Sequence, residues 1–244
     1  KKSFQIFKER FSNAADFEFS FVGNIPVDTF KNYVLTYLAS LPGMKMRENY
    51  KDLNIRPPKN IDKKIFKGSD PKSHVTLIFN DTMTYNRSNA YYLRSLEDYL
   101  DIRLYEILRE ELSGVYGVGV TCSLNRIPYQ NYNVIFRIPC APNNVDSLVN
   151  QSLKIIEDIK MNGISDDYLK KIKETQLREH EINIKTNNYW LNYLENTSLF
   201  NDDISRIDKF TEEIEKLSSN DIKNIANRVF DHNKIQVTLF PEKK

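Results

Sequence analysis

The strongest pattern in the sequence is an apolar stripe with helical spacing between residues 86 and 112. Its members recur every three or four residues: Leu93, Leu96, Leu100, Leu104 and Ile107. Such a stripe predicts a long helix that buries one face in a core. Gly114 is suited to end this helix, because glycine adopts the left-handed cap conformation without steric cost. A strand-like run follows at once, so we expect a tight corner between helix and strand.

Pairs of strand-like segments flank the long helix on both sides in the sequence. The first pair covers residues 61–67 and 73–80, and the second covers about 115–126 and 130–139. In the last of these segments apolar residues alternate with others, which is typical of a strand. No crossover helix separates the members of a pair, so we expect each pair to be antiparallel.

The remaining segments are two further strands and a series of helices. Residues 17–22, FEFSFV, place phenylalanine at every second position and predict a strand with one strongly apolar face. A helix is expected from about Pro26 to Leu41, and the polar stretch 43–60 is expected to be a loop or linker. The later elements are helices at 143–161, 165–184, 187–199, 204–217 and 220–229, and a final strand at 235–240.

The order of these elements determines the expected fold class. Strands in adjacent pairs, with most helices grouped after them, predict an α+β fold: a mostly antiparallel sheet with helices packed on one face. We expect residues 1–244 to form a single domain of this kind, because the 43–60 loop is too short to separate two domains with confidence. No internal repeat is apparent.

Composition excludes several classes of function. The chain has 35 basic and 33 acidic residues, a net charge of +2, and therefore lacks the basic field that drives binding to nucleic acid or anionic membranes. No apolar run reaches the length of a membrane span. The opening KKSFQIFKERF has neither an initiator methionine nor a signal peptide, and we interpret it as the middle of a longer protein.

The sequence contains no recognisable metal or nucleophile motif. Its histidines, His74, His180 and His232, form neither H-E-x-x-H nor H-x-x-E-H, and G-x-S-x-G is also absent. Cys122 and Cys140 are eighteen residues apart on neighbouring strand-like segments, without a nearby histidine, so a zinc knuckle is not expected. Their positions permit a disulfide, but two buried thiols are the simpler interpretation. We expect no cofactor or metal in this chain.

The corner itself carries the candidate site residues. Arg109 lies in the last turn of the long helix and Tyr116 lies at the start of the next strand, seven residues later. An arginine at a helix end is stabilised by the macrodipole, and a tyrosine in a strand is usually a packing residue. Taken alone, the two residues therefore favour a structural role. The glycines at 114, 117 and 119 would let an extended peptide or another domain approach the strand closely.

Three segments, in the same order, resemble the pitrilysin, insulin-degrading-enzyme and mitochondrial-processing-peptidase family of zinc peptidases. YLDIRLYEILREELSGVYGVGV (residues 99–120) is similar to its C-terminal region, which carries arginine-leucine, then leucine-arginine-glutamate, then a glycine and a tyrosine. In this chain these are Arg103-Leu104, Leu108-Arg109-Glu110, Gly114 and Tyr116. FEFSFVGNIPVDTFKNYVLTYLASLP (17–42) resembles the family's opening strand, turn and helix, and NGISDDYLKKIK (162–173) resembles its glycine-led helix start.

The resemblance implies a place in a larger enzyme. Family members close two halves, each of two related α+β domains, around the substrate, and the H-x-x-E-H zinc site lies in the first domain. This chain lacks that motif, so the resemblance implies the last, substrate-enclosing domain, inactive alone, with zinc in the N-terminal part of the parent protein. The implied partners are a peptide or unfolded protein substrate and a zinc-bearing domain of the same chain or of a partner subunit. A periplasmic or envelope location is mildly favoured by the family.

The resemblance also implies roles for Arg109 and Tyr116. Both would reach across the closed chamber to substrate at the zinc centre. Tyr116 would donate a hydrogen bond to the oxyanion that forms on the attacked peptide carbonyl, and Arg109 would hold substrate carbonyls with its fork of donors. Two alternatives stay open: a catalytically dead structural or partner subunit of the same superfamily, and an interaction module unrelated to proteolysis.

Overall fold

The computed structural model of the protein describes residues 1–44, 49–111 and 117–242, with the backbone alone for residues 108–111. The chain divides into two compact units. We call residues 52–176 and 212–244 the sheet unit, and residues 1–51 and 177–211 the helical unit. The assignment of residues 1–244 to one domain of a longer protein stays a prediction.

The sheet unit is built on five strands in the order β1-β5-β2-β4-β3. The strands are β1 (Ile61–Phe66), β2 (Ser73–Thr82), β3 (Gly119–Asn125), β4 (Asn131–Cys140) and β5 (Asn233–Phe240). β1 pairs parallel with β5, and every other pairing is antiparallel. The predicted mostly antiparallel sheet is therefore confirmed, as is the hairpin of β3 and β4.

One expected pairing is wrong, because β1 and β2 are not neighbours. β5 lies between them, with Ile235 opposite Ile61 on β1 and opposite Ile78 on β2. A strand between two others forms hydrogen bonds along both of its edges, so a third strand can separate two that are adjacent in sequence. The short connection between β1 and β2 carried no sign of this, because the competing strand comes from the other end of the chain.

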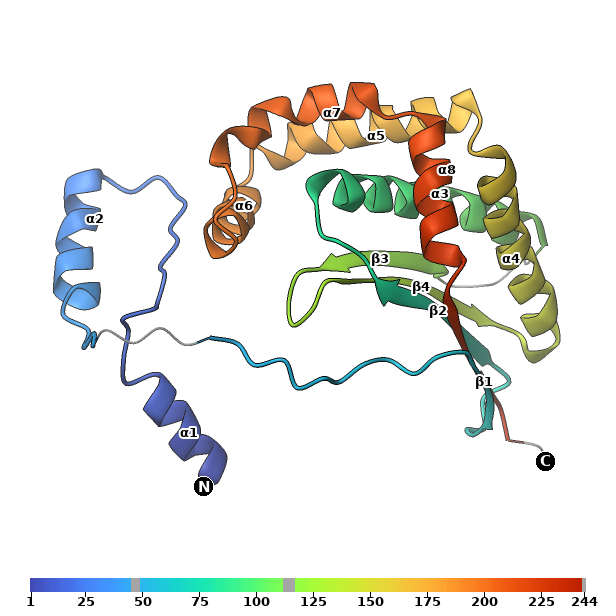
Figure 1. Cartoon of the computed structure of the whole chain (residues 1–244), viewed down its shortest axis with the longest axis horizontal. Coiled ribbons are helices and arrows are strands. Elements are labelled where there is room, and N and C mark those ends of the chain that lie inside the picture. Colours follow the sequence, from blue (N-terminus) through green and yellow to red (C-terminus); the bar gives the residue numbers. More distant parts are fainter. Residues whose placement is uncertain (45–48, 112–116, 243–244) are drawn as a thin grey trace. The chain divides into compact units, whose positions relative to one another are not determined.

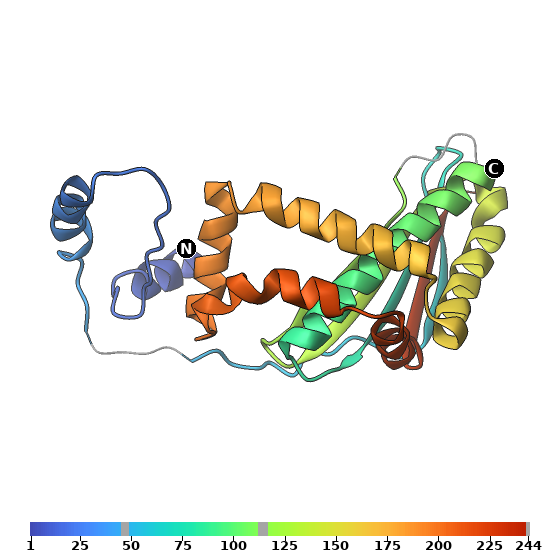
Figure 2. The same ribbon diagram turned by 90° about the horizontal axis from the view of Figure 1, so that it is seen from above.

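Three helices cover one face of the sheet, as predicted. They are α3 (Arg87–Glu111), α4 (Val145–Asn162) and α8 (Ser219–Phe230), and they also contact one another (Figures 1 and 2). The largest side chains buried between these helices and the sheet include Leu77 and Phe136 from the strands and Leu93, Leu96 and Leu100 from α3. The apolar stripe that predicted the long helix therefore faces the core. No helix within the described ranges is long and apolar enough to cross a membrane.

A buried polar network joins α3 to α5 (Asp166–Asn183), which leaves the sheet unit for the helical unit. The side chain of Gln176 is 1% exposed. Its Nε2 donates to Asp98 Oδ2 at 2.6 Å and to Ser95 Oγ at 3.1 Å, and its Oε1 accepts from Tyr91 Oη at 2.8 Å. Buried polar atoms are costly unless they are hydrogen-bonded, so this network restrains α5 at one position along α3.

The turn between α4 and α5 requires glycine. Gly163 has φ of +75°, in the left-handed region, and a Cβ added there would lie 2.6 Å from Ser219 Oγ. Ser219 occupies this space because its hydroxyl accepts from Ile164 N–H and donates to Ile164 O. Conformation and close approach together therefore exclude a side chain at this position.

The helical unit contains α1 (Lys2–Arg10), α2 (Val27–Tyr33) with a π-helical turn at Val34–Leu38, α6 (Asn187–Leu199) and a 3-10 turn at Ile204–Lys209. The next helix, α7 (Phe210–Lys216), leads the chain back into the sheet unit. The strand expected at residues 17–22 is not formed, and α1 was not anticipated. Among the described residues no strand lies beside 17–22, so its backbone has no ladder to join. Phe17, Phe19 and Phe21 remain 38–49% exposed.

We expect Phe136→Ala to lower the free energy of unfolding by about 3–5 kcal/mol, because the substitution leaves a cavity in the core. Phe136 is fully buried, with the rings of Phe79 and Phe230 at 6.0 and 6.2 Å between centroids. Urea denaturation followed by circular dichroism measures the change. The matched control is Phe4→Ala, at a ring 71% exposed, with an expected change below about 0.5 kcal/mol. Equal losses in the two variants would contradict this description of the core.

Candidate functional site

The predicted site is the corner between α3 and β3. Arg109 lies in the last turn of α3, as expected, and the structure describes its backbone but not its side chain. Tyr116 lies outside the described residues altogether, as does Gly114. Gly117, the first described residue after the gap, has φ of +72°, a conformation that favours glycine. The structure therefore describes the two flanks of the corner.

The helix flank is tied to α5 by a charged cluster. Arg103 Nη1 donates to Glu106 Oε2 at 2.7 Å and to Tyr168 Oη at 3.0 Å, and Tyr168 Oη donates to Glu106 Oε2 at 2.6 Å. Partial burial disfavours the charge on Glu106, but the hydrogen bonds from Tyr168 and Arg103 outweigh it and lower the Glu106 pKa. The two α3 residues of the cluster, Arg103 and Glu106, lie six and three residues before Arg109, about 9 and about 4.5 Å along the helix axis.

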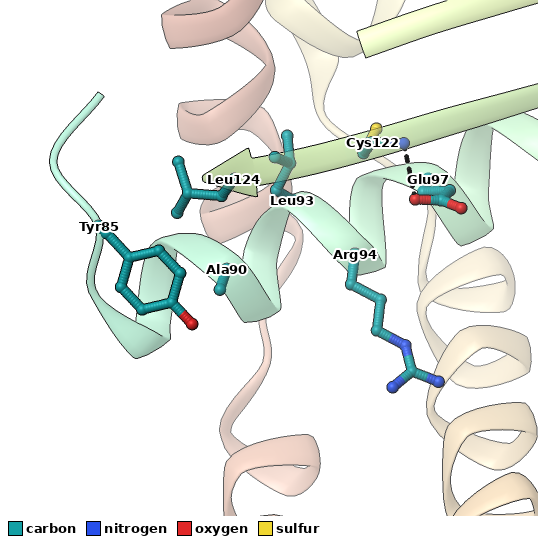
Figure 3. Close-up of a pocket in the computed structure, with 7 residues that line it drawn as sticks. All are labelled: Tyr85, Ala90, Leu93, Arg94, Glu97, Cys122 and Leu124. Carbon is teal, nitrogen blue, oxygen red and sulfur yellow. Dashed lines mark hydrogen bonds between the residues drawn. The ribbon is translucent and has the colours of Figure 1, made fainter. Parts of the chain in front are cut away.

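The strand flank is held by two carboxylates of α3. Asp101 Oδ1 accepts from Val120 N–H at 2.7 Å, and Glu97 Oε2 accepts from Cys122 N–H at 2.8 Å (Figure 3). β3 is an edge strand of the sheet, so these N–H groups lie along its outer side. Asp101 and Glu97 are one helical turn apart and therefore share a face of α3. They attach the first residues of β3 to the helix and occupy an edge that another strand could otherwise join.

Burial disfavours the charged form of both carboxylates and raises the pKa of each. Burial is the main cause of the raised pKa of Glu97; the hydrogen bond from Cys122 opposes it, and the negative charges of Asp101 and Asp98 add to it. Burial also raises the pKa of Asp101 against its hydrogen bond from Val120, although Asp101 as a whole residue is exposed. The sequence gives no sign of this role for Glu97 and Asp101, because acidic residues spaced four apart on a helix usually mark a solvated face.

A shallow hollow of about 310 Å³ lies between the first half of α3 and β3 (Figure 3). Tyr85, Leu93, Arg94, Glu97 and Cys122 are among the residues that line it. It is distant from the corner, because Arg94 and Arg109 are 15 residues apart, about 22 Å along the helix. Burial raises the pKa of the Cys122 thiol well above its usual value, so this thiol is a poor nucleophile at neutral pH.

Neither the cysteines nor the histidines form a site. Cys122 and Cys140 are free thiols, Cys140 buried and Cys122 half-buried. His74 is exposed on β2, while His180 packs in the helical unit against the Phe210 ring at 4.8 Å, and partial burial lowers its pKa. Within the described ranges no three His, Cys, Asp or Glu side chains cluster closely enough to hold a metal ion. These residues do not fit a catalytic zinc.

Comparison with known proteins gives a consistent family. The model of the peptidase M16 inactive domain matches residues 1–176. The probable zinc protease PqqL of Haemophilus influenzae is 26% identical over 167 residues, which are 67% of this chain and 18% of that protein. The chain therefore spans less than a fifth of that relative's length.

Solved structures share the fold. The periplasmic protease PqqL from Escherichia coli superposes with a TM-score of 0.74 at 18% identity, over 90% of this chain and 25% of that one. The ferredoxin protease FusC, solved with an Arabidopsis ferredoxin, gives a TM-score of 0.74 at 12% identity, over 91% of this chain and 24% of that one. At these identities the likeness concerns the fold alone.

The two carboxylates of α3 that bind the β3 backbone predict an unusual pH dependence of stability. The raised pKa of Glu97 means that the folded chain binds its proton more tightly than the unfolded chain does. This group's contribution to stability is therefore complete below its unfolded pKa, near 4.5, and falls as the pH rises through the folded pKa. A glutamine in place of Glu97 can still accept the hydrogen bond from Cys122 N–H, but it carries no charge.

We therefore expect Glu97→Gln to flatten that decline and to be at least as stable as the wild type at pH 7. Urea denaturation between about pH 4 and pH 8 measures the free energy of unfolding at each pH. Glu174→Gln, on a side chain 65% exposed, is the control and should leave the pH profile unchanged. A Glu97→Gln profile parallel to that of the wild type would refute the assigned cause.

Proposed function

Since the chain belongs to the peptidase M16 family, we propose that it is the non-zinc C-terminal domain of a zinc metalloendopeptidase and that it encloses the peptide substrate. The observation that supports this most is the anchored corner. Its helix flank is fixed to α5 by the Arg103–Glu106–Tyr168 cluster, and its strand flank is fixed to α3 by Asp101 and Glu97. A corner restrained on both sides suits residues that have to meet a substrate in a defined geometry.

In this proposal Arg109 and Tyr116 act on the substrate from a domain that holds no metal. The Tyr116 hydroxyl donates a hydrogen bond to the oxyanion that forms on the attacked carbonyl, where a fixed donor is most effective. The Arg109 guanidinium, which is always charged, holds substrate carbonyl oxygens through its planar set of donors. The zinc site belongs to another domain of the same polypeptide or to a partner subunit.

The proposed substrate is a peptide or an unfolded protein. Family membership supports this class, and the ferredoxin protease that shares the fold was solved with a protein bound. The Escherichia coli relative is a periplasmic protease, so we propose a periplasmic or envelope location for this protein.

Arg109→Ala and Tyr116→Phe test the roles in the full-length protein. We expect each to lower kcat for peptide cleavage by on the order of 100-fold or more, because each removes a donor that acts in the transition state. Stopped or continuous assays with a quenched fluorescent peptide give kcat and KM separately. Tyr50→Phe, which removes a hydroxyl from a residue 62% exposed, is the control and should retain full activity.

The outcomes distinguish a domain that acts in catalysis from a catalytically dead subunit of the same family. If wild-type protein cleaves peptides and both variants cleave equally well, the corner is a packing feature and the proposed roles are wrong. If the full-length protein with zinc cleaves no peptide, the alternative of a catalytically dead structural or partner subunit takes precedence.

The 244-residue chain alone should hold much less than one zinc ion per molecule after equilibration with zinc and dialysis. The described His, Cys, Asp and Glu side chains form no cluster suited to a metal, and three protein ligands are the minimum for catalytic zinc. Elemental analysis of the dialysed chain measures the ratio. One bound zinc per chain, accompanied by peptidase activity, would overturn the assignment as a non-zinc domain.

A further inference from the structure

The hollow between the first half of α3 and β3 has walls that are already held in place. The Cζ atom of Arg126 lies 3.9 Å from the centre of the Tyr85 ring, and Tyr85 N–H donates to Gln130 Oε1 at 2.8 Å. Farther along α3, the hydrogen bond from Cys122 N–H to Glu97 keeps the strand beside the helix (Figure 3). A hollow whose walls are fixed before a ligand arrives loses little conformational entropy on binding.

Beside the hollow, the outer edge of β3 changes from closed to open. Asp101 and Glu97 bind the first two outward N–H groups of the strand. Backbone groups of an edge strand point outward at every second residue, so Leu124 is the next residue to present them. The matching position of α3, one turn before Glu97, is Leu93, which carries no acceptor. Within the described ranges no side-chain oxygen accepts from Leu124 N–H, and the hollow opens at this point.

The hollow is lined mainly by apolar groups. Leu93 is 1% exposed, Leu124 is half-buried, and Ala90 is the smallest of the lining side chains. Figure 3 shows Tyr85 and Arg94 projecting on either side of Ala90. The volume, about 310 Å³, is at the lower end of the range for ligand sites. An apolar hollow beside an outward N–H and C=O suits one large apolar side chain of an extended peptide.

The hollow and the corner lie along the same pair of elements, α3 and β3. Their separation along α3, about 22 Å between Arg94 and Arg109, equals about six or seven residues of extended peptide at about 3.3 Å each. We propose that the hollow is a subsite for the peptide substrate and holds a large apolar side chain about six or seven residues from the cleaved bond. Leu124 N–H and C=O bind the peptide backbone at the same residue. This inference rests on the proposed function.

A peptide fits this place better than a strand of another domain or of a second copy. An added strand needs outward N–H groups over several residues, and Asp101 and Glu97 already occupy those at the start of β3. β3 ends at Asn125, so Leu124 is the last residue of the strand with an outward N–H. One residue's backbone and one apolar side chain form a single anchor point. Such a point selects among peptides by their sequence at a distance from the cleaved bond.

Cleavage by the full-length protein tests the subsite with two quenched fluorescent peptides. Both extend about eight residues to each side of the same cleaved bond; one carries phenylalanine at the sixth and seventh positions on each side, and the other carries serine there. We expect the phenylalanine peptide to have a KM about 10-fold lower, because the hollow buries part of an aromatic side chain. The kcat should be equal for the two peptides, because this contact is the same in the ground state and the transition state.

Ala90→Trp fills the hollow and should abolish the preference for the phenylalanine peptide. Ser88→Trp is the matched control: it places the same side chain at an exposed position two residues earlier on α3, outside the lining, and should keep the preference. Circular dichroism shows whether each variant is folded. If Ala90→Trp does not fold, Ala90→Glu, which suits a helix and places a charge in the hollow, takes its place with the same expectation.

A second measurement does not depend on cleavage. The phenylalanine peptide carries p-benzoylphenylalanine at the seventh position and is irradiated with full-length protein from which zinc has been removed. Mass spectrometry should locate the cross-link in residues 85–97 or 122–124, the two segments that line the hollow. Ala90→Trp should lose most of this cross-link, and Ser88→Trp should keep it.

Equal KM values of the two peptides with the wild-type protein would overturn the inference, as would equal effects of Ala90→Trp and Ser88→Trp. A cross-link outside the lining segments would do the same. If the full-length protein with zinc cleaves no peptide, the proposed catalytic function fails, and the cross-link then decides on the subsite by itself. If cleavage requires Arg109 and Tyr116 but KM does not respond to phenylalanine, the proposed function stands and the subsite is wrong.

Discussion

Helix α3 is held from three directions, and the sheet unit depends on that arrangement. Its leucine stripe packs on the sheet, Glu97 and Asp101 accept hydrogen bonds from the edge of β3, and Ser95 and Asp98 join Gln176 of α5. An α-helix is stiff, so contacts on its separate faces fix each partner relative to the others. The corner at the end of α3 therefore starts from a defined position, whatever substrate or domain it meets.

The α3 carboxylates that bind β3, Glu97 and Asp101, show that high stability and a protected strand edge are separate requirements. Burial and mutual repulsion oppose the charge of Glu97, which lowers stability at neutral pH. The same charges occupy the N–H groups of an edge strand and make that edge unattractive to a further strand. Proteins commonly accept a loss of stability for control of pairing, and this strand start is consistent with such a compromise.

Local patterns predicted most of the elements but not their long-range pairing. Leu93, Leu96 and Leu100 identified α3 because helical periodicity is contained within a short window. The separation of β1 from β2 could not be read locally, since the strand between them is the last in the chain.

The candidate site was predictable to a similar degree. The position of Arg109 in the last turn of α3 follows from helix periodicity and is confirmed, while its role and that of Tyr116 stay predictions. The supporting residues were missed, because Glu97 and Asp101 acquire their meaning only when β3 lies beside α3. Hydrogen bonds from side chain to distant backbone leave no periodic trace in a sequence.

The central position of β5 has a consequence for how the chain folds. Ile235 pairs with Ile61 and Ile78, residues more than 150 positions earlier, so the sheet has a high contact order. During synthesis β1 and β2 emerge long before the strand that joins them. Until that strand leaves the ribosome, both carry an open edge that can pair with other chains. Productive folding of the sheet unit therefore waits for residues 233–240, and until they are made the nascent chain exposes the sheet edges that β5 later covers.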